Sequence, residues 1–175
     1  MKIAVVMDPI SNIDFKKDST LLLIYEAQKR NHDVFYIESN NLFFDGKEAC
    51  ALSSKIKVKM DRENWFSLKD TNKIFLKDLD VVFMRQDPPF DMGYINNTYV
   101  LDSAEKGGVK IYNKPSALRN FNEKISILEY SKFCTETIIA YDKKLILNFI
   151  EQHKDVVTKP INLMGGQVIE KLNLN

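Results

Sequence analysis

Residues 156 to 166, VVTKPINLMGG, are the best candidate in the chain for contact with a nucleotide. Lys159 ends a short apolar run that is typical of a strand, so its ammonium can point from the strand end toward a phosphate. Gly165 and Gly166 allow the backbone to approach a ligand closely and to offer its amides to phosphate oxygens. A tight hairpin turn with an exposed lysine would explain the same pattern, and a glycine pair alone does not separate the two interpretations.

A second charged loop, MRQDPPFD at residues 84 to 91, comes directly after another apolar run. Arg85 could bind a carboxylate there, because the guanidinium presents a fixed fork of donors. An ion pair between Arg85 and Asp87 or Asp91 that only rigidifies the loop is equally consistent with the spacing. Residues 7 to 19 are also polar and also allow two interpretations: they could line a site, or they could cap a helix that begins near Asp18.

The sequence excludes or disfavours several common kinds of site. It contains neither the G-x-x-x-x-G-K-[ST] pattern of a P-loop nor the G-x-G-x-x-G pattern of a dinucleotide-binding fold. His32 and His153 stand apart without the spacing of metal ligands or of a histidine-based triad. Cys50 and Cys134 lie far apart, so we expect two buried thiols rather than a disulfide framework.

The charge distribution favours small-molecule partners. The formal net charge is +1, and the lysines are scattered among carboxylates instead of forming a basic stripe. We therefore expect neither a nucleic acid nor a membrane surface as the main partner. The opening MKIAVVMDP has one lysine and a short apolar run, which is too little for a signal peptide, so we expect a cytoplasmic protein.

The prolines of the chain follow strands or open the turns just after them. These residues are Pro9, Pro88, Pro89, Pro115 and Pro160. Proline biases the residue before it toward extended geometry, which holds charged residues at strand ends: Asp8, Asp87, Lys114 and Lys159. Ligands of open α/β sheets bind outside the carboxyl ends of the strands, so this pattern favours a polar crevice there. The alternative is that each proline merely ends a strand.

The first 121 residues have the pattern of an α/β domain with a parallel sheet. Short apolar runs predict buried strands at residues 2 to 7, 33 to 37, 80 to 84 and 109 to 112. Helical spacing predicts helices from residue 18 to 30 and from about 93 to 106. Residues 41 to 60 alternate around Asp45 and Gly46 and predict a hairpin at the sheet edge. The alternation of strands and helices implies a right-handed crossover between parallel strands.

Residues 122 to 175 form a second, smaller unit. The pattern predicts a helix at residues 123 to 133, a strand at 137 to 140 and a helix capped by Asp142. A strand ending at Lys159 and another opening at Val168 follow. About 55 residues is below the size at which a lone core is comfortable, so we expect this unit to be incomplete.

Four segments together resemble bacterial glutathione synthetase, a member of the ATP-grasp superfamily. They are VVMDPISNI, LDVVFMRQDPPFD, YNKPSALRNFNEK and VVTKPINLMGG, at residues 5 to 13, 79 to 91, 112 to 124 and 156 to 166. The resemblance implies an α/β fold, with a pre-ATP-grasp parallel-sheet domain at residues 1 to 121. A partial ATP-grasp domain at residues 122 to 175, its first α+β lobe, would follow, and the chain would stop after that lobe.

The resemblance also implies roles for individual residues. Lys124 and Lys159 would contact ATP, and a small loop carried by Met164, Gly165 and Gly166 would close over the phosphates. Arg85 and Asp87 would lie on the side of the peptide substrate. Family members typically have an acid and a glycine where this chain has Asn162 and Leu163. The metal-binding residues of the family would lie beyond Asn175.

The activity implied by the resemblance is that of glutathione synthase, an ATP-dependent carbon–nitrogen ligase. It joins γ-glutamylcysteine to glycine through an acyl phosphate, with ATP as co-substrate and Mg²⁺ or Mn²⁺ as cofactor. The resemblance further implies self-association. We expect the 175-residue chain alone to be inactive, and the alternative is a non-catalytic nucleotide-binding or interaction relic of such a ligase.

Overall fold

The computed structural model describes residues 1–173 and divides the chain into two compact units. The first unit is Met1–Asn120 and the second is Phe121–Asn175. No helix in the described part of the chain is both long and apolar enough to cross a membrane.

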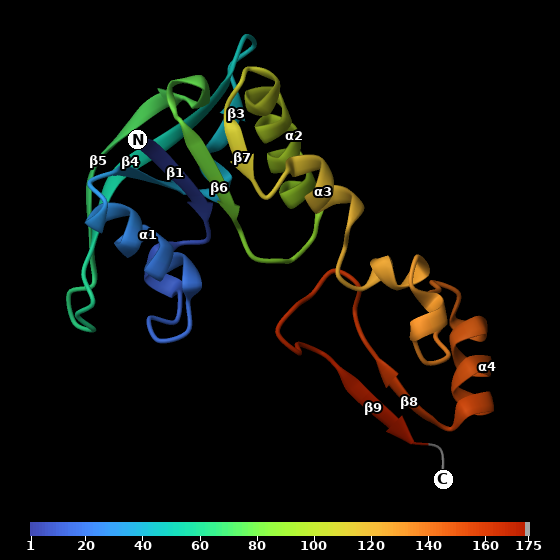
Figure 1. Ribbon diagram of the computed structural model, residues 1–175. Helices are drawn as coiled ribbons and strands as arrows, with labels where there is room; N and C mark the ends of the chain where they lie inside the picture. The colour runs from blue at the N-terminus through green and yellow to red at the C-terminus, as the bar shows by residue number, and fades with distance from the viewer. Residues whose placement is uncertain (174–175) are drawn as a thin grey trace. The chain divides into compact units, whose positions relative to one another are not determined.

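Four parallel strands form the centre of the first unit (Figure 1). They are β1 (Lys2–Met7), β2 (Asp33–Glu38), β6 (Val81–Arg85) and β7 (Lys110–Tyr112). β1 pairs with β2 on one side and with β6 on the other, and β7 adds to β6. Every residue of β1 after Lys2 is buried, as expected for a strand covered on both faces. The predicted parallel sheet is thus confirmed.

An antiparallel extension completes the sheet beside β2. β3 (Leu42–Phe44) and β4 (Ala49–Val58) form the hairpin that the sequence predicts at the sheet edge. β5 (Phe66–Phe75) pairs along β4 and was not expected from the sequence. Its residues are exposed or half-buried on both faces, so they lack the apolar alternation that reveals a half-buried strand. The strand order is β3-β4-β2-β1-β6-β7, with β5 on β4.

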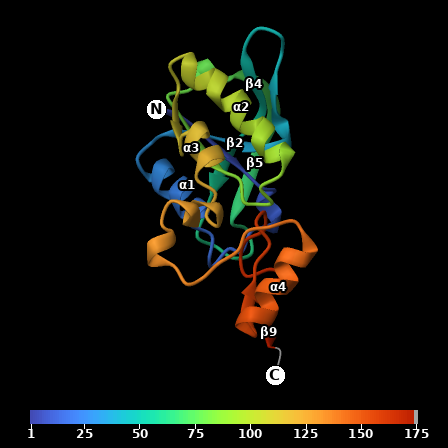
Figure 2. The same ribbon diagram turned by 90° about the vertical axis from the view of Figure 1, so that its right-hand side faces the viewer.

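The helices of the first unit cover opposite faces of the sheet (Figure 1, Figure 2). α1 (Ser19–Lys29) packs against the face that carries Ile3, Val5 and Met7 of β1. α2 (Met92–Lys106) packs against the face that carries Ala4 and Val6. This division follows from the two-residue period of a strand, which sends successive side chains to opposite faces.

Both long helices of the first unit begin at a capping aspartate. Asp18, as predicted, accepts hydrogen bonds from the amides of Thr20 and Leu21 at the start of α1. Asp91 accepts from the amide of Tyr94 at the start of α2. Each cap pairs amides that have no partner within the helix, which fixes where the helix begins.

A short helix, α3 (Pro115–Asn120), is held against α2 by one arginine. A terminal guanidinium nitrogen of Arg119 lies 2.5 Å from Oδ2 of Asp102, and the other lies 2.9 Å from the hydroxyl of Thr98. The guanidinium also lies over the ring of Tyr99, 4.5 Å from its centroid. The arginine of the NKPxxLR motif therefore connects two helices of the first unit.

Several single 3₁₀ turns connect these elements. Those of the first unit are Ile10–Asn12, Ser39–Asn41 and Leu76–Asp78. Those of the second unit are Ile125–Leu128 and Ser131–Phe133.

The second unit contains α4 (Lys143–His153) and an antiparallel pair of strands, β8 (Asp155–Thr158) and β9 (Glu170–Asn173). Asp142 caps α4, as predicted, by accepting from the amides of Lys144 and Leu145. β8 ends one residue before Lys159, close to the predicted end.

Three expectations for the second unit were wrong. The helix predicted at residues 123 to 133 is two separate 3₁₀ turns, since no residue there is buried and a continuous helix would gain no packing. Residues 137 to 140 are not a strand, and none of them is buried, so their apolar side chains gain little from lying in a sheet. β9 begins at Glu170 rather than at Val168, whose φ of 53° places it in a turn.

Candidate functional site

The carboxyl ends of β1 and β6 lie side by side, because Met7 pairs with Arg85 in the parallel ladder. Asp8 follows β1, and its Oδ2 accepts a hydrogen bond of 2.8 Å from the amide of Asp87 in the loop after β6. The two polar loops that the prolines mark therefore meet at one edge of the sheet, where ligands of open α/β sheets bind.

Arg85 is oriented by hydroxyl groups at the start of α1. Its Nε lies 3.1 Å from Oγ1 of Thr20, and a terminal nitrogen lies 2.9 Å from Oγ of Ser19. Within residues 1–173 the guanidinium forms no ion pair with a carboxylate, so the Arg–Asp pair considered from the sequence is absent. These hydroxyls leave the positive charge and the remaining donors of Arg85 for a carboxylate ligand.

The carboxyl group beside this arginine is perturbed. Burial raises the pKa of Asp87, and repulsion from Asp8 and Asp18 raises it further, while Arg85 acts in the opposite direction. Burial also raises the pKa of Tyr94, and the charges of Asp87 and Asp8 add to the effect. The edge is therefore rich in carboxylates and disfavours further negative charge except next to Arg85.

In the second unit, Asn122 organises the turn that carries Lys124. The side-chain Oδ1 of Asn122 accepts from the amides of Lys124 and Ile125, at 2.9 and 3.1 Å. The ammonium of Lys124 lies 2.6 Å from Oε1 of Glu123 and donates to the main-chain carbonyl of Leu163. Because the Lys124 side chain is only 19% exposed, it is held at this position against the loop that follows β8.

Lys124 and Lys159 line the same cavity, although 35 positions separate them in the sequence. The cavity has a volume of about 1090 Å³, and both lysines share it with apolar side chains such as Ile138, Ile150 and Val156. Its size is close to that of sites for cofactors and other small molecules. The wall also carries the carboxylates of Glu123, Glu136 and Asp155, so the part of the cavity next to the two ammonium groups is the part suited to an anion, while the apolar side chains suit an apolar group on the same ligand.

The loop between β8 and β9 contains two glycines in the left-handed region, Gly165 at φ 64° and Gly166 at φ 76°. Residues with a Cβ rarely adopt this conformation, so the loop shape depends on both glycines. The half-buried Met164 precedes them, and its carbonyl accepts a hydrogen bond from the amide of Gln167. All the residues expected to contact ATP thus belong to one unit.

Sequence reasoning did not single out Ser19, Thr20 or Asn122. The serine and threonine follow the helix cap, and only the fold brings their hydroxyls to Arg85. Asn122 had a recognisable signal, because an asparagine that precedes a turn often accepts from the amide two residues later.

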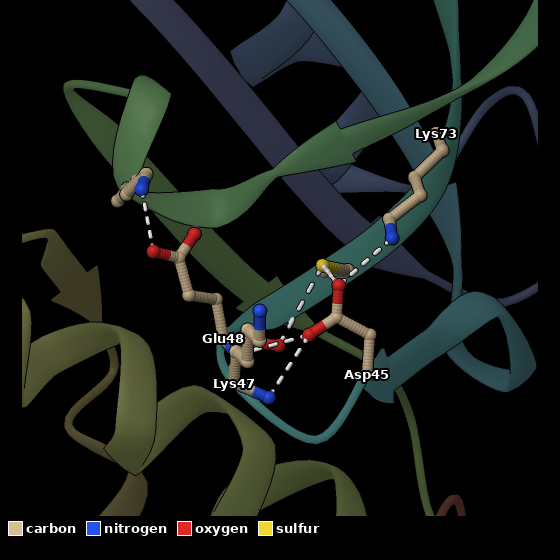
Figure 3. Close-up of polar contacts among 6 residues, drawn as sticks. Asp45, Lys47, Glu48 and Lys73 are labelled. Atoms are coloured by element: carbon tan, nitrogen blue, oxygen red, sulfur yellow. Dashed lines mark hydrogen bonds and ion pairs between the residues drawn. The ribbon is translucent and has the colours of Figure 1, made fainter.

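A further polar cluster, at the turn between β3 and β4, has a structural explanation (Figure 3). Asp45 accepts from the amides of Lys47 and Glu48 and forms an ion pair of 2.8 Å with Lys73 of β5. The hydrogen bond from Lys73 is the main cause that lowers the pKa of Asp45 below its usual range. These contacts close the hairpin and join it to β5.

The two cysteines have different environments. Cys50 is fully buried, its Sγ lies 3.5 Å from Oδ2 of Asp45, and burial raises the pKa of its thiol. Cys134 is exposed, so the expectation of two buried thiols was wrong for this residue. It lies after a 3₁₀ turn in a segment without buried residues, which offers no core to enclose it.

Two models of known protein families match the two parts of the chain. Residues 1–119 match the family model "Prokaryotic glutathione synthetase, N-terminal domain". Residues 123–175 match "Prokaryotic glutathione synthetase, ATP-grasp domain". The chain belongs to the prokaryotic glutathione synthetase family. The resemblance seen in the sequence motifs is thereby confirmed, as is the α/β fold class.

Curated relatives support the same family along nearly the whole chain. The chain is 45% identical to the glutathione synthetase of Wigglesworthia glossinidia brevipalpis over 97% of its length and 53% of that relative. It is 41% identical to the glutathione synthetase of Escherichia coli (strain K12), over 97% of the chain and 54% of the relative. The chain spans about half the length of the curated relatives that it matches.

Solved structures share the fold at low sequence identity. The ATP-grasp ligase PsnB, in complex with a phosphomimetic variant of its minimal precursor, Mg and ADP, has a TM-score of 0.52 and 15% identity. The match covers 98% of this chain and 57% of the PsnB chain. D-alanyl-alanine synthetase A from Vibrio cholerae has a TM-score of 0.52 and 12% identity, with 99% of this chain and 52% of that one covered. These likenesses concern the fold alone.

Proposed function

We propose that the chain supplies the substrate-side domain and the first nucleotide-binding lobe of a glutathione synthase. Residues 1 to 121 would be the pre-ATP-grasp domain and residues 122 to 175 part of the ATP-grasp domain. Family membership supports this proposal. The observation that carries it is the cavity of the second unit, which Lys124 and Lys159 line together, beside a loop with two glycines.

Each lysine would offset charge on the phosphates of ATP. An ammonium has three donors, and the structure assigns two of those of Lys124 to Glu123 and Leu163, which leaves one for a phosphate oxygen. Lys159 is exposed at the end of β8 and can reach into the same cavity. Main-chain amides at Gly165 and Gly166 would bind further phosphate oxygens, as in other anion-binding turns.

The first unit would bind the peptide substrate through Arg85. γ-Glutamylcysteine carries two carboxylates, and a guanidinium already oriented by Ser19 and Thr20 can bind one of them with paired hydrogen bonds. Asp87 lies in the same loop and would contact the same substrate. The carboxylates of Asp8, Asp18 and Asp87 would repel the other carboxylate of the dipeptide from this edge, and this repulsion would help to fix the orientation of the dipeptide.

The proposed reaction has two steps. The cysteinyl carboxylate of γ-glutamylcysteine attacks the γ-phosphorus of ATP and releases ADP, which gives an acyl phosphate. The amine of glycine then attacks the acyl carbon, loses a proton, and releases inorganic phosphate as the peptide bond forms. An acyl phosphate hydrolyses easily, so a loop such as residues 160 to 166 that can exclude water would favour synthesis.

Mg²⁺ accompanies ATP in our proposal, but no described residue can be given to it. Among residues 1–173, no group of three or more His, Cys, Asp or Glu side chains is arranged to hold a metal ion. The residues described here therefore fit the anionic part of the nucleotide and not the metal. Because both cysteines are free thiols, we propose the reducing cytoplasm as the location of the protein.

A chimera tests the proposal directly. Residues 1 to 175 would replace the matching part of the Escherichia coli glutathione synthetase, and ADP release would be measured with each substrate omitted in turn. We expect ADP release to require γ-glutamylcysteine. Equal ADP release without the dipeptide would refute the assigned substrate.

A non-catalytic relic is the second candidate, because Asn162 and Leu163 replace the acid and glycine that family members typically carry. The chimera with Asn162→Asp and Leu163→Gly is the discriminating control. Activity in both chimeras supports the ligase, whereas activity only after the double substitution supports a chain that has lost catalysis.

A further inference from the structure

Asn122 contacts both segments that form the lysine-lined cavity. Its Oδ1 caps the turn that carries Lys124, and its Nδ2 donates a hydrogen bond of 3.4 Å to the main-chain carbonyl of Ile161. Ile161 lies in the loop that ends at Gly165 and Gly166. One half-buried amide group therefore joins the lysine turn to the glycine loop within the second unit.

The orientation of this amide is fixed by its neighbours. Oxygen and nitrogen of an asparagine are assigned from the surrounding hydrogen bonds, and here the two amides of Lys124 and Ile125 require an acceptor. If the group were flipped, two donors would face Nδ2, and the oxygen would face the carbonyl of Ile161. The donor of Asn122 must therefore point at the loop.

A second contact between the same two segments comes from Lys124, whose ammonium donates to the carbonyl of Leu163. The two contacts respond differently to an anionic ligand. A phosphate competes for the ammonium of Lys124, because hydrogen bonds between ionised groups are stronger than those to a neutral carbonyl. The neutral amide of Asn122 has no such competing interaction, so its contact with Ile161 can persist when the lysine turns to the ligand.

We infer that Asn122 is a positioning residue, which holds the loop of residues 160 to 166 beside Lys124 whether or not a polyphosphate ligand is bound. The inference rests on the proposed nucleotide site and deepens it. Asn122 arranges the loop in the absence of ligand, and the two lysines contact the phosphate directly.

Hydrogen exchange on the 175-residue chain tests this assignment without ligand. Asn122→Asp keeps an acceptor for the turn amides but replaces the donor to Ile161 with a carboxylate oxygen that repels the carbonyl. We expect exchange at the amides of Gln167 and Ile169, which donate to the loop carbonyls of Met164 and Gly166, to increase roughly two- to tenfold, as for the loss of one hydrogen bond. Exchange at Lys124 and Ile125 should stay as in the wild type.

Two further variants separate positioning from a general loss of structure. Asn122→Ala removes both functions of the side chain and should increase exchange in the turn and in the loop. Asn148→Asp makes the same chemical change at an exposed position of α4 and should alter neither segment. Wild-type exchange in the loop of Asn122→Asp, or equal increases in loop and turn, would overturn the inference.

Binding of MgATP, measured by calorimetry on the same proteins, distinguishes this inference from the proposed function. Faster loop exchange in Asn122→Asp, together with weaker binding of MgATP, supports both. Faster loop exchange in a chain whose wild type does not bind MgATP supports the positioning role and contradicts nucleotide binding by this chain.

Discussion

Arg119→Ala should destabilise the first unit by removing the connection between α3 and α2. Arg119 is 17% exposed and Asp102 is 21% exposed, so the ion pair between them is largely shielded from water. The substitution leaves Asp102 without its partner and Thr98 without the guanidinium donor. It also removes the contact with the face of Tyr99.

The expected size of the effect follows from these contacts. A hydrogen bond to a charged group contributes about 1.5 to 3 kcal/mol, and the bond to the hydroxyl about 1 kcal/mol. The contact with Tyr99 adds about 0.5 kcal/mol, because that ring is largely exposed. The contributions are not additive, and residual solvent weakens the ion pair, so we expect a loss of about 3 kcal/mol in the free energy of unfolding.

Urea denaturation followed by tryptophan fluorescence measures this loss in the first unit. Trp65 is the single tryptophan of the chain, and it packs against Phe15 and Phe66 in that unit. For a slope of about 2 kcal/mol per molar urea, the midpoint should fall by about 1.5 M. Arg119→Lys keeps the charge but not the fork of donors, so its midpoint should lie between those of wild type and Arg119→Ala.

A double-mutant cycle with Asp102→Asn isolates the ion pair from the other contacts. We expect a coupling free energy of about 1 to 2 kcal/mol between the two positions. An unchanged midpoint in Arg119→Ala, or a coupling near zero, would refute the view that this pair fastens α3 to α2.

Three further results are expected. Lys159→Ala should weaken MgATP binding, measured by calorimetry, by roughly tenfold or more, because a charge-assisted hydrogen bond to phosphate is lost; unchanged affinity would remove Lys159 from the site. The contact with Lys73 lowers the pKa of Asp45, so it stabilises the first unit above about pH 4, and this contribution is lost as the pH falls further. Asp45→Asn should therefore unfold with a shallower dependence on pH below about pH 4, whereas curves parallel to wild type would contradict the assignment. In thiol titration of the folded chain, Cys134 should react at once and Cys50 only after unfolding, and two fast thiols would show that Cys50 is accessible.

Matched variants serve as controls for these measurements. Lys143→Ala removes an exposed lysine of α4 that does not line the cavity, so it should leave MgATP binding unchanged. Asp61→Asn removes a carboxylate at an exposed turn and should keep the pH dependence of the wild type.

The sequence predicts the first unit well, because burial imposes a regular pattern on it. β1 and β6 are short apolar runs, and Asp18 is recognisable as a helix cap. β5 escaped prediction because its register comes from pairing with β4, while its side chains face solvent. Backbone pairing of that kind leaves little trace in the hydrophobic pattern.

The second unit was harder to predict, because few of its residues are buried. Only Ile150 and Val156 are buried in α4 and β8, so apolar residues elsewhere in the unit do not report which segments pack. Residues 123 to 133 are apolar enough to suggest a helix, yet none of them is buried, and the segment contains two 3₁₀ turns instead. The lysines could be nominated from motifs, but their common cavity follows only from the fold.

The contacts that Asn122 and Lys124 make with the loop both end on main-chain oxygens, those of Ile161 and Leu163. Every amino acid carries the same main-chain carbonyl, so evolution can exchange the side chains of residues 161 and 163 without removing either acceptor. Drift at residues 161 to 163 is therefore a poor guide to whether the loop still docks. An alignment that scores only side chains would overlook what this segment must preserve, which is the path of its backbone.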